Sequence, residues 1–259
     1  MKKEFCFTVD DNIRFLKELA EEKGKSIFDH PYLAVYRRLH EKHGLKVQLN
    51  LFDACEGFTL ADTTDAYRDE FAENADWLKM SFHSRIENVH PYRAAPYEEV
   101  YADCDAVQKE ILRFASPAAL AKTTTLHFCT ATADGVRAMR DTGTKGLLGL
   151  YGTPEHPRTS YQTSQSDGDR IRAGETVTDG EIAYAGIDIV LNCYSTDENL
   201  SLLRLLYGRP LIKVMIHEQY FYSDYPLYQP DFEEKLDAVF TALGENGYRS
   251  THFENTLKI

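Results

Sequence analysis

Short apolar runs alternate with amphipathic segments along most of the 259-residue chain. The runs have the length of buried strands, and the segments between them repeat their apolar positions with the three-to-four-residue spacing of helices. The expected strands are 4–9, 46–52, 77–82, 124–128, 146–151, 188–191, 211–216 and 249–253. The expected helices are 12–23, 31–43, 65–75, 98–114, 133–141, 199–207 and 231–246. This order predicts an α/β fold with mostly parallel strands, arranged as a distorted or incomplete (β/α) barrel in a single domain over 1–259.

One region interrupts the alternation. Residues 153–186 are rich in Thr, Ser, Asp, Gly and Arg and contain few apolar residues. We expect an inserted polar loop here, with a short hairpin around 170–178. Such insertions serve either as lids over a binding site or as solvated loops, and the sequence leaves both interpretations open.

The composition disfavours some classes of binding partner. The 29 basic and 41 acidic residues give a formal charge of −12, which disfavours nucleic acid because a phosphate backbone is bound by basic surfaces. The chain passes from Met1 directly into a strand, without an apolar signal segment or a membrane span, so we expect a cytoplasmic protein that does not enter membranes. The five cysteines show no paired spacing that would indicate a disulfide framework. The oligomeric state is not specified by the sequence.

Two polar clusters directly follow expected strands. The first is Asp10-Asp11, and the second is His83-Ser84 with Glu87 and His90 nearby. Adjacent carboxylates raise each other's pKa unless a cation neutralises them, so a cation or a proton-transfer role is implied. If the chain becomes helical after residue 82, His83 and Glu87 project from one helix face. Imidazole and carboxylate ligands suit zinc, nickel, cobalt, manganese or iron. The alternatives are that Asp11 caps the following helix and that His83 is a packed core histidine.

The same clusters resemble the motifs of the polysaccharide deacetylase family. Phe7-Thr8-Val9-Asp10-Asp11 is similar to the Thr-Phe-Asp-Asp motif that opens the family's distorted (β/α) barrel, and His83-Ser84 with Glu87 is similar to its second, metal-binding motif. The resemblance implies that Asp10 is the general base. It implies that Asp11, His83 and Glu87 bind one divalent metal ion, with His90 as an alternative third ligand.

The resemblance extends to the end of the chain but not to every motif. His217 follows the expected strand 211–216, as does a family histidine that acts as general acid, and its alternative role is a histidine bonded to a backbone carbonyl. The family's Arg-x-Pro element, which orients the base, is not found around 126–130. His127 lies there instead, either taking part of that role or as a packed side chain.

These assignments predict a metal-dependent hydrolase that cleaves an amide or ester of a small-molecule or oligosaccharide substrate, with zinc as the first choice of metal and nickel, cobalt or manganese as alternatives. The alternatives to this function are a non-catalytic sugar-binding barrel and a glycoside hydrolase on the same barrel. Residues that follow strands or motif positions are expected to contact the substrate. They are His127, Tyr92, Tyr151, Asn192, Glu218 and Tyr220.

Overall fold

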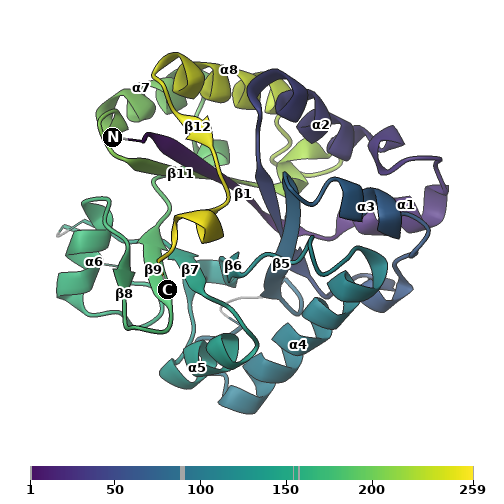
Figure 1. The fold of residues 1–259 in the computed structure, drawn as a ribbon, viewed down its shortest axis with the longest axis horizontal. Coiled ribbons are helices and arrows are strands. Elements are labelled where there is room, and N and C mark those ends of the chain that lie inside the picture. Colours follow the sequence, from purple (N-terminus) through teal and green to yellow (C-terminus); the bar gives the residue numbers. More distant parts are fainter. Residues whose placement is uncertain (1, 88–90, 154, 157, 259) are drawn as a thin grey trace.

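The strands lie at the centre of the molecule and the helices surround them (Figure 1). A computed structural model describes residues 2–87, 91–153, 155–156 and 158–258. Its helices are α1 Arg14–Glu22, α2 Pro31–His43, α3 Arg68–Glu73, α4 Tyr97–Phe114, α5 Ala133–Asp141, α6 Gln165–Arg172, α7 Thr196–Leu206 and α8 Phe232–Glu245. Its strands are β1 Glu4–Asn12, β2 Val47–Phe52, β3 Ala54–Cys55, β4 Phe58–Thr59, β5 Leu78–Ser84, β6 Thr123–Thr124, β7 Gly146–Gly149, β8 Val177–Thr178, β9 Ala183–Gly186, β10 Ile189–Val190, β11 Leu211–His217 and β12 Arg249–Ser250.

Two sheets form the wall of the barrel. The first has the order β10-β11-β1-β2-β5 with all of these pairs parallel, and β12 pairs with β1. The second has the order β6-β7-β9-β8, in which β8 and β9 form an antiparallel hairpin. A single parallel bridge between Met80 and Leu120 links β5 to the segment before β6. On the other side, β9 pairs with β7 and the following β10 pairs with β11, so the chain itself joins the sheets.

This arrangement confirms the predicted fold class. The strands are mostly parallel, and the named strand pairs of the described residues leave the ring open at β5/β6 and at β9/β10, as in a distorted barrel. Buried aromatic side chains fill the space between β1 and the outer helices, where the rings of Phe5 and Phe7 lie 5.5 and 5.0 Å from that of Phe240 on α8. No helix of the described residues is both long and apolar enough to cross a membrane.

The predicted insertion needs correction. Within 153–186 the chain forms helix α6, and the hairpin joins β8 to β9 rather than lying around 170–178. The last strand of the region, β9, pairs in parallel with β7 and belongs to the barrel wall. Its four residues Ala183–Gly186 are all buried, but two alanines and a glycine give a weak hydrophobic signal. The polar excursion therefore ends before β9.

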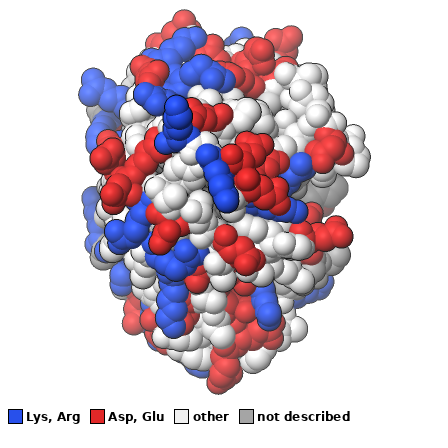
Figure 2. Space-filling view, turned by 90° about the vertical axis from the view of Figure 1, so that its right-hand side faces the viewer, with Lys and Arg blue, Asp and Glu red and all other residues white. Residues whose placement is uncertain are grey.

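The outer surface carries charges of both signs. Figure 2 shows the face on the right-hand side of Figure 1, on which lysine and arginine side chains are interspersed with aspartate and glutamate. Exposed ion pairs of the protein include Arg38 with Glu233 at 2.5 Å and Lys42 with Asp237 at 2.7 Å. Exposed pairs of this kind contribute little to stability.

Candidate metal and catalytic site

Asp10 and Asp11 reach the same cavity because strand β1 is irregular at its carboxyl end. Val9 pairs with Leu49 and Asn12 pairs with Leu51, so two residues of β1 lie opposite the single residue Asn50. This is a β-bulge. Asp11 also has a φ of 63°, in the left-handed region that non-glycine residues rarely adopt. A regular strand would direct two neighbouring side chains to opposite faces, whereas here both carboxylates line one cavity of about 310 Å³.

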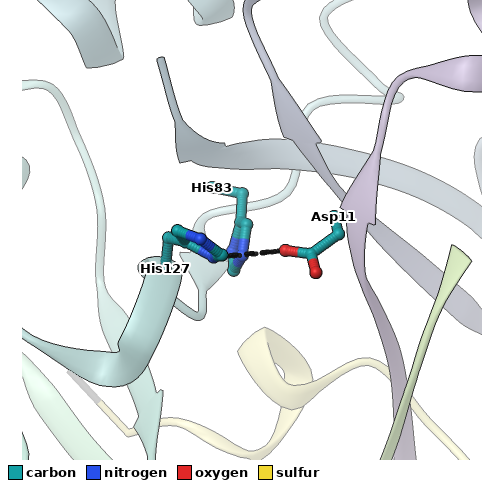
Figure 3. A group of neighbouring side chains, drawn as sticks. All are labelled: Asp11, His83 and His127. Atoms are coloured by element: carbon teal, nitrogen blue, oxygen red, sulfur yellow. Dashed lines mark hydrogen bonds and ion pairs between the residues drawn. The ribbon is translucent and has the colours of Figure 1, made fainter. Parts of the chain in front are cut away.

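His83 and His127 meet Asp11 in the centre of this end of the barrel (Figure 3). His83 Nε2 lies 3.0 Å from Asp11 Oδ1 and 3.1 Å from His127 Nδ1, and His127 Nδ1 lies 3.2 Å from Asp11 Oδ1. All three side chains are buried. Ligands that each lie about 2.0–2.2 Å from one ion are separated from one another by roughly 3.0–3.4 Å, so this triangle of atoms fits a divalent transition metal.

The surrounding hydrogen bonds fix the orientation of these side chains. His83 Nδ1 bonds to the carbonyl oxygen of Thr125, which can only accept, so this nitrogen donates. In the neutral ring, Nε2 would then offer its lone pair to a metal ion. Asp11 Oδ2 accepts a hydrogen bond of 2.8 Å from Gln219, which leaves Oδ1 for the two histidines. His127 Nε2 is buried and has no hydrogen-bond partner among the described residues.

The pKa shifts of Asp11 and His83 indicate that their surroundings favour a positive charge beside Asp11. Burial alone would raise the pKa of Asp11, but hydrogen bonds from His127 and His83 hold it well below its usual range. Burial alone would lower the pKa of His83, but the charge of Asp10 and the hydrogen bond to Asp11 raise it. A proton on His83 and a bound cation would therefore compete for the same negatively charged surroundings.

The third position of this group corrects two expectations from the sequence. Glu87 is exposed and, although it lines the cavity, it does not belong to the cluster of ligand atoms found among the described residues. The reason is local: β5 continues to Ser84 and residues 85–87 form a bend rather than a helix, so His83 and Glu87 do not have the spacing of one helix face. His127, expected to contact substrate, is the third member instead. His90, the alternative ligand, lies outside the described residues.

His127 reaches the group from a tight turn after strand β6. It begins the 3-10 helix His127–Cys129, in which Phe128 and Cys129 have φ values of 59° and 56°. Left-handed non-glycine residues are costly and often occur at functional sites. Its position in the sequence offered a signal, because His127 lies just beyond a parallel strand and Asp11 and His83 lie at the carboxyl ends of two others.

Asp10 and His217 lie on the adjacent strands β1 and β11, where they are paired in register, and both line the cavity. Asp10 Oδ1 accepts a hydrogen bond of 2.6 Å from Asn50 Nδ2. Burial raises the pKa of Asp10, and the positive charges of His83 and His217 oppose this rise. A carboxylate with a raised pKa is a better proton acceptor near neutral pH.

The His217 ring is held by the side chain of Asn192, and not by a backbone carbonyl as in the alternative considered from the sequence. Asn192 Oδ1 lies 2.8 Å from His217 Nδ1, and because an amide oxygen only accepts, His217 Nδ1 carries a proton. Nε2 is then the nitrogen available to a ligand. The ring of Tyr220 lies 6.1 Å from that of His217, and Tyr220 lines the same cavity.

Three of the residues expected to contact substrate instead make contacts within the protein. Tyr92 is buried and its hydroxyl bonds to Asp103 and to the backbone N–H of Arg85. Tyr151 packs against the hydrophobic core and is not among the described residues that line the 310 Å³ cavity. Glu218 is fully buried and accepts hydrogen bonds from the N–H groups of the first residues of α1 and the one before it, Ile13, Arg14 and Phe15, at 2.7, 3.0 and 2.9 Å.

Glu218, and not Asp11, caps the N-terminus of α1. The residue before the helix is Ile13, which provides no side-chain cap, and the free N–H groups bond to Glu218 instead. A negative charge is favoured at a helix N-terminus. Burial nevertheless raises the pKa of Glu218 to about 7, against the effect of these three hydrogen bonds. Asp11 is therefore free for the histidines.

The cavity continues into a second one of about 410 Å³. The two share Asp11, Glu87 and Gln219, and the second extends along Arg14, Phe52 and Cys55. Together they form one cleft across the carboxyl ends of β1, β2 and β5. This is the edge at which ligands bind in parallel α/β structures.

No protein-family model matches the sequence, and no curated protein matches it. Solved structures do. A 4-α-glucanotransferase from Thermococcus litoralis is similar over 98% of this chain, with a TM-score of 0.62 and 14% identity, and this chain spans 40% of its length. A family 4 acetyl xylan esterase from Clostridium thermocellum, in complex with a cobalt ion, is similar over 98% of this chain and 89% of its own, with a TM-score of 0.51 and 11% identity. A polysaccharide deacetylase from Bacillus cereus gives a TM-score of 0.46 at 14% identity over 98% of this chain and 94% of its own.

The likeness to the glucanotransferase and the esterase concerns the fold. It agrees with the polysaccharide deacetylase-like barrel that the motifs predicted. Since these two enzymes act on carbohydrates by different chemistry, the choice of reaction rests on the residues of the site.

Proposed function

We propose that this protein is a metal-dependent hydrolase that removes an acyl group from an amide or ester of a small carbohydrate-like substrate. The observation on which this rests is the triangle of Asp11, His83 and His127 ligand atoms, 3.0–3.2 Å apart, in a cavity that Asp10 and His217 also line. Three protein ligands leave coordination positions open, which is typical of catalytic rather than structural sites. The cobalt ion of the similar esterase supports the assignment.

Asp11, His83 and His127 would hold the ion, and we propose zinc. When bound, such an ion supplies positive charge that polarises an acyl carbonyl and acidifies water. In the reaction, the oxygen of a water attacks the acyl carbon and its proton passes to Asp10. The bond from the acyl carbon to nitrogen or oxygen then breaks, and His217, protonated on both ring nitrogens, gives its Nε2 proton to the leaving amine or alkoxide. Asp10 releases its proton to solvent, from which His217 is protonated again. The products are a carboxylic acid and the free amine or alcohol.

The carboxylates of the cavity fit this reaction better than glycoside cleavage. A glycosidase needs two carboxyl groups on opposite sides of one bond, about 5–9.5 Å apart. Of the acids that line the cavity among the described residues, Asp11 contacts two imidazoles and Glu87 is exposed. Asp10 is left without an obvious carboxyl partner across the cavity.

The test is acetate release by zinc-loaded protein from N-acetylglucosamine, diacetylchitobiose and p-nitrophenyl acetate, together with metal analysis. The parent is expected to release acetate and to contain one ion per chain. His127→Ala is expected to lose both, whereas Glu87→Ala, a matched change in the same cleft, is expected to keep its metal. Acetate release that is absent from the fully loaded parent would favour the non-catalytic sugar-binding alternative. New reducing ends without acetate would favour a glycoside hydrolase.

A further inference from the structure

A chain of buried polar side chains crosses the interior of the barrel beneath Asp10. Its members lie on β2, β5 and β6, three neighbouring elements of the wall, and each is at most 3% exposed. They are Gln48, Asn50, Ser81, Thr123 and Thr124. Polar groups in such a position destabilise the fold unless they are hydrogen-bonded, and an apolar interior would be simpler. The network therefore calls for an explanation beyond packing.

The network fixes the direction of the Asn50 amide. Asn50 Oδ1 accepts hydrogen bonds from Gln48 Nε2 at 2.8 Å and from Ser81 Oγ at 2.6 Å. Because both partners donate, this atom must be the oxygen, and the NH₂ group points the other way, to Asp10 Oδ1 at 2.6 Å. A flip of the amide would place donors against donors.

The amide of Gln48 is fixed in turn by two hydrogen bonds to Thr123. Its Nε2 donates to the carbonyl oxygen of Thr123 at 2.8 Å, and its Oε1 accepts from the Thr123 hydroxyl at 3.0 Å. Ser81 Oγ also lies 3.1 Å from Thr124 Oγ1. The direction of the Asn50 amide is thus set by residues on β2, β5 and β6, and none of them lines the 310 Å³ cavity.

The contact matters because Asp10 sits on the bulge of β1, where the regular ladder between β1 and β2 is interrupted. At this interruption the Asn50 side chain donates a hydrogen bond to one oxygen of the Asp10 carboxylate, and Asp10 lines the cavity. Among the residues that the structure describes, no lysine or arginine bonds to Asp10. A neutral amide holds the carboxylate in place without neutralising its negative charge.

We propose that Asn50 is the positioning residue of the general base, and that Gln48 and Ser81 set its orientation. This inference rests on the proposed function, since Asp10 acts as a base only in that reaction. A displacement of the base by about 1 Å can cost about a hundredfold in rate. Loss of the Asn50 donor is therefore expected to lower kcat about tenfold to a hundredfold.

A double-mutant cycle separates positioning from general stability. Zinc-loaded parent, Asn50→Ala, Asp10→Asn and the double variant are compared for kcat and KM of acetate release. Asn50→Ala is expected to lower kcat with less than about a threefold change in KM, and to have no further effect on kcat in the Asp10→Asn background. An equal loss in both backgrounds, or parental kcat in Asn50→Ala, would overturn the inference while leaving the proposed function intact. An inactive parent overturns both.

Thr8→Val provides the matched control. Thr8 lies on β1 one inward-facing position before Asp10, is 3% exposed, and its hydroxyl has no hydrogen-bond partner among the described residues. Its kcat is expected to stay within about twofold of the parent. If Asn50→Ala fails to fold, Asn50→Leu keeps a similar side-chain volume without any donor, and the same criteria apply to it.

A crystal structure of Asn50→Ala gives a readout that is independent of turnover. The Asp10 side chain is expected to leave its position or to occupy several, while Asp11, His83 and His127 stay in place. An Asp10 side chain that is unchanged in the variant would contradict the proposal.

Discussion

Two buried carboxylates, Asp11 and Glu218, lie at the same cleft and have opposite surroundings. Asp11 contacts two imidazoles and the amide of Gln219, which are side chains that a cation could share or displace. Glu218 contacts three backbone N–H groups at the start of α1, which belong to the fold itself. The pKa of Asp11 is held well below its usual range, whereas that of Glu218 is raised to about 7. Both side chains are buried, so their exposure does not distinguish their roles, whereas their hydrogen-bond partners do.

The comparison predicts its largest effect for a matched pair of amide substitutions. Asp11→Asn removes a ligand charge and is expected to weaken zinc binding by at least about a hundredfold, since even residues behind the ligands cost about tenfold to a hundredfold. Glu218→Gln is expected to keep zinc affinity within a few-fold of the parent. Calorimetric titration of chelator-treated protein with zinc measures both. Equal losses in the two variants would mean that the two carboxylates do not differ in role.

A smaller effect is expected for the residue that orients Asp11. Gln219 donates to Asp11 Oδ2, so Gln219→Ala should leave the ligands in place but less well directed. We expect zinc affinity to fall about tenfold to a hundredfold. The same titration measures it, with Gln229→Ala as a control because Gln229 bonds to the carbonyl of Asn192 instead. A Gln219→Ala variant with parental affinity would show that this hydrogen bond does not support the metal site.

The pH dependence of metal binding tests the Asp11 side of the comparison further. The pKa of His83 is raised by the neighbouring carboxylates, so a proton occupies the position that a metal needs. Zinc affinity should therefore rise by about tenfold per pH unit up to this pKa and level off above it. Titrations between about pH 5 and 8 measure the dependence. An affinity that does not change over this range would contradict the competition between proton and metal.

The smallest effect concerns stability on the Glu218 side. Its folded pKa of about 7 lies above the ordinary value of 4.5, so the native state retains a proton that the unfolded state loses between these values. The free energy of unfolding should thus decrease as pH rises from about 4.5 to 7, by up to about 1.4 kcal/mol per pH unit from this group. Urea unfolding of the parent and of Glu218→Gln measures the difference. A slope that is identical in both would contradict the raised pKa.

The sequence was sufficient for the repeating elements and insufficient where the chain departs from regular geometry. Apolar runs identified β1, β2, β5 and β11, and they placed Asp10, His83 and His217 at the carboxyl ends of parallel strands. The weak strand β9 was missed, and the helical continuation on which the pairing of His83 with Glu87 depended is not found in residues 85–87. Both errors come from local signals that the tertiary structure overrides.

The site could be predicted in type but not in membership. Asp11 lines the cavity because β1 has a bulge there and Asp11 itself has a left-handed φ, and no glycine in the sequence marks this position. His127 is placed by a turn in which the next two residues also have left-handed φ values. Glu218 caps a helix more than 200 positions earlier in the chain, so no local pattern could reveal that contact. The missing Arg-x-Pro element signalled a difference in how the base is held, but only the folded structure points to Asn50.

The central claim is that Asp11, His83 and His127 bind one divalent ion in the cavity that Asp10 and His217 share. Anomalous X-ray diffraction from crystals grown with zinc tests it most directly. The account predicts a single strong peak within about 2.0–2.2 Å of Asp11 Oδ1, His83 Nε2 and His127 Nδ1. A peak bound by Glu87 instead of His127, or a site that stays empty at saturating zinc, would contradict it.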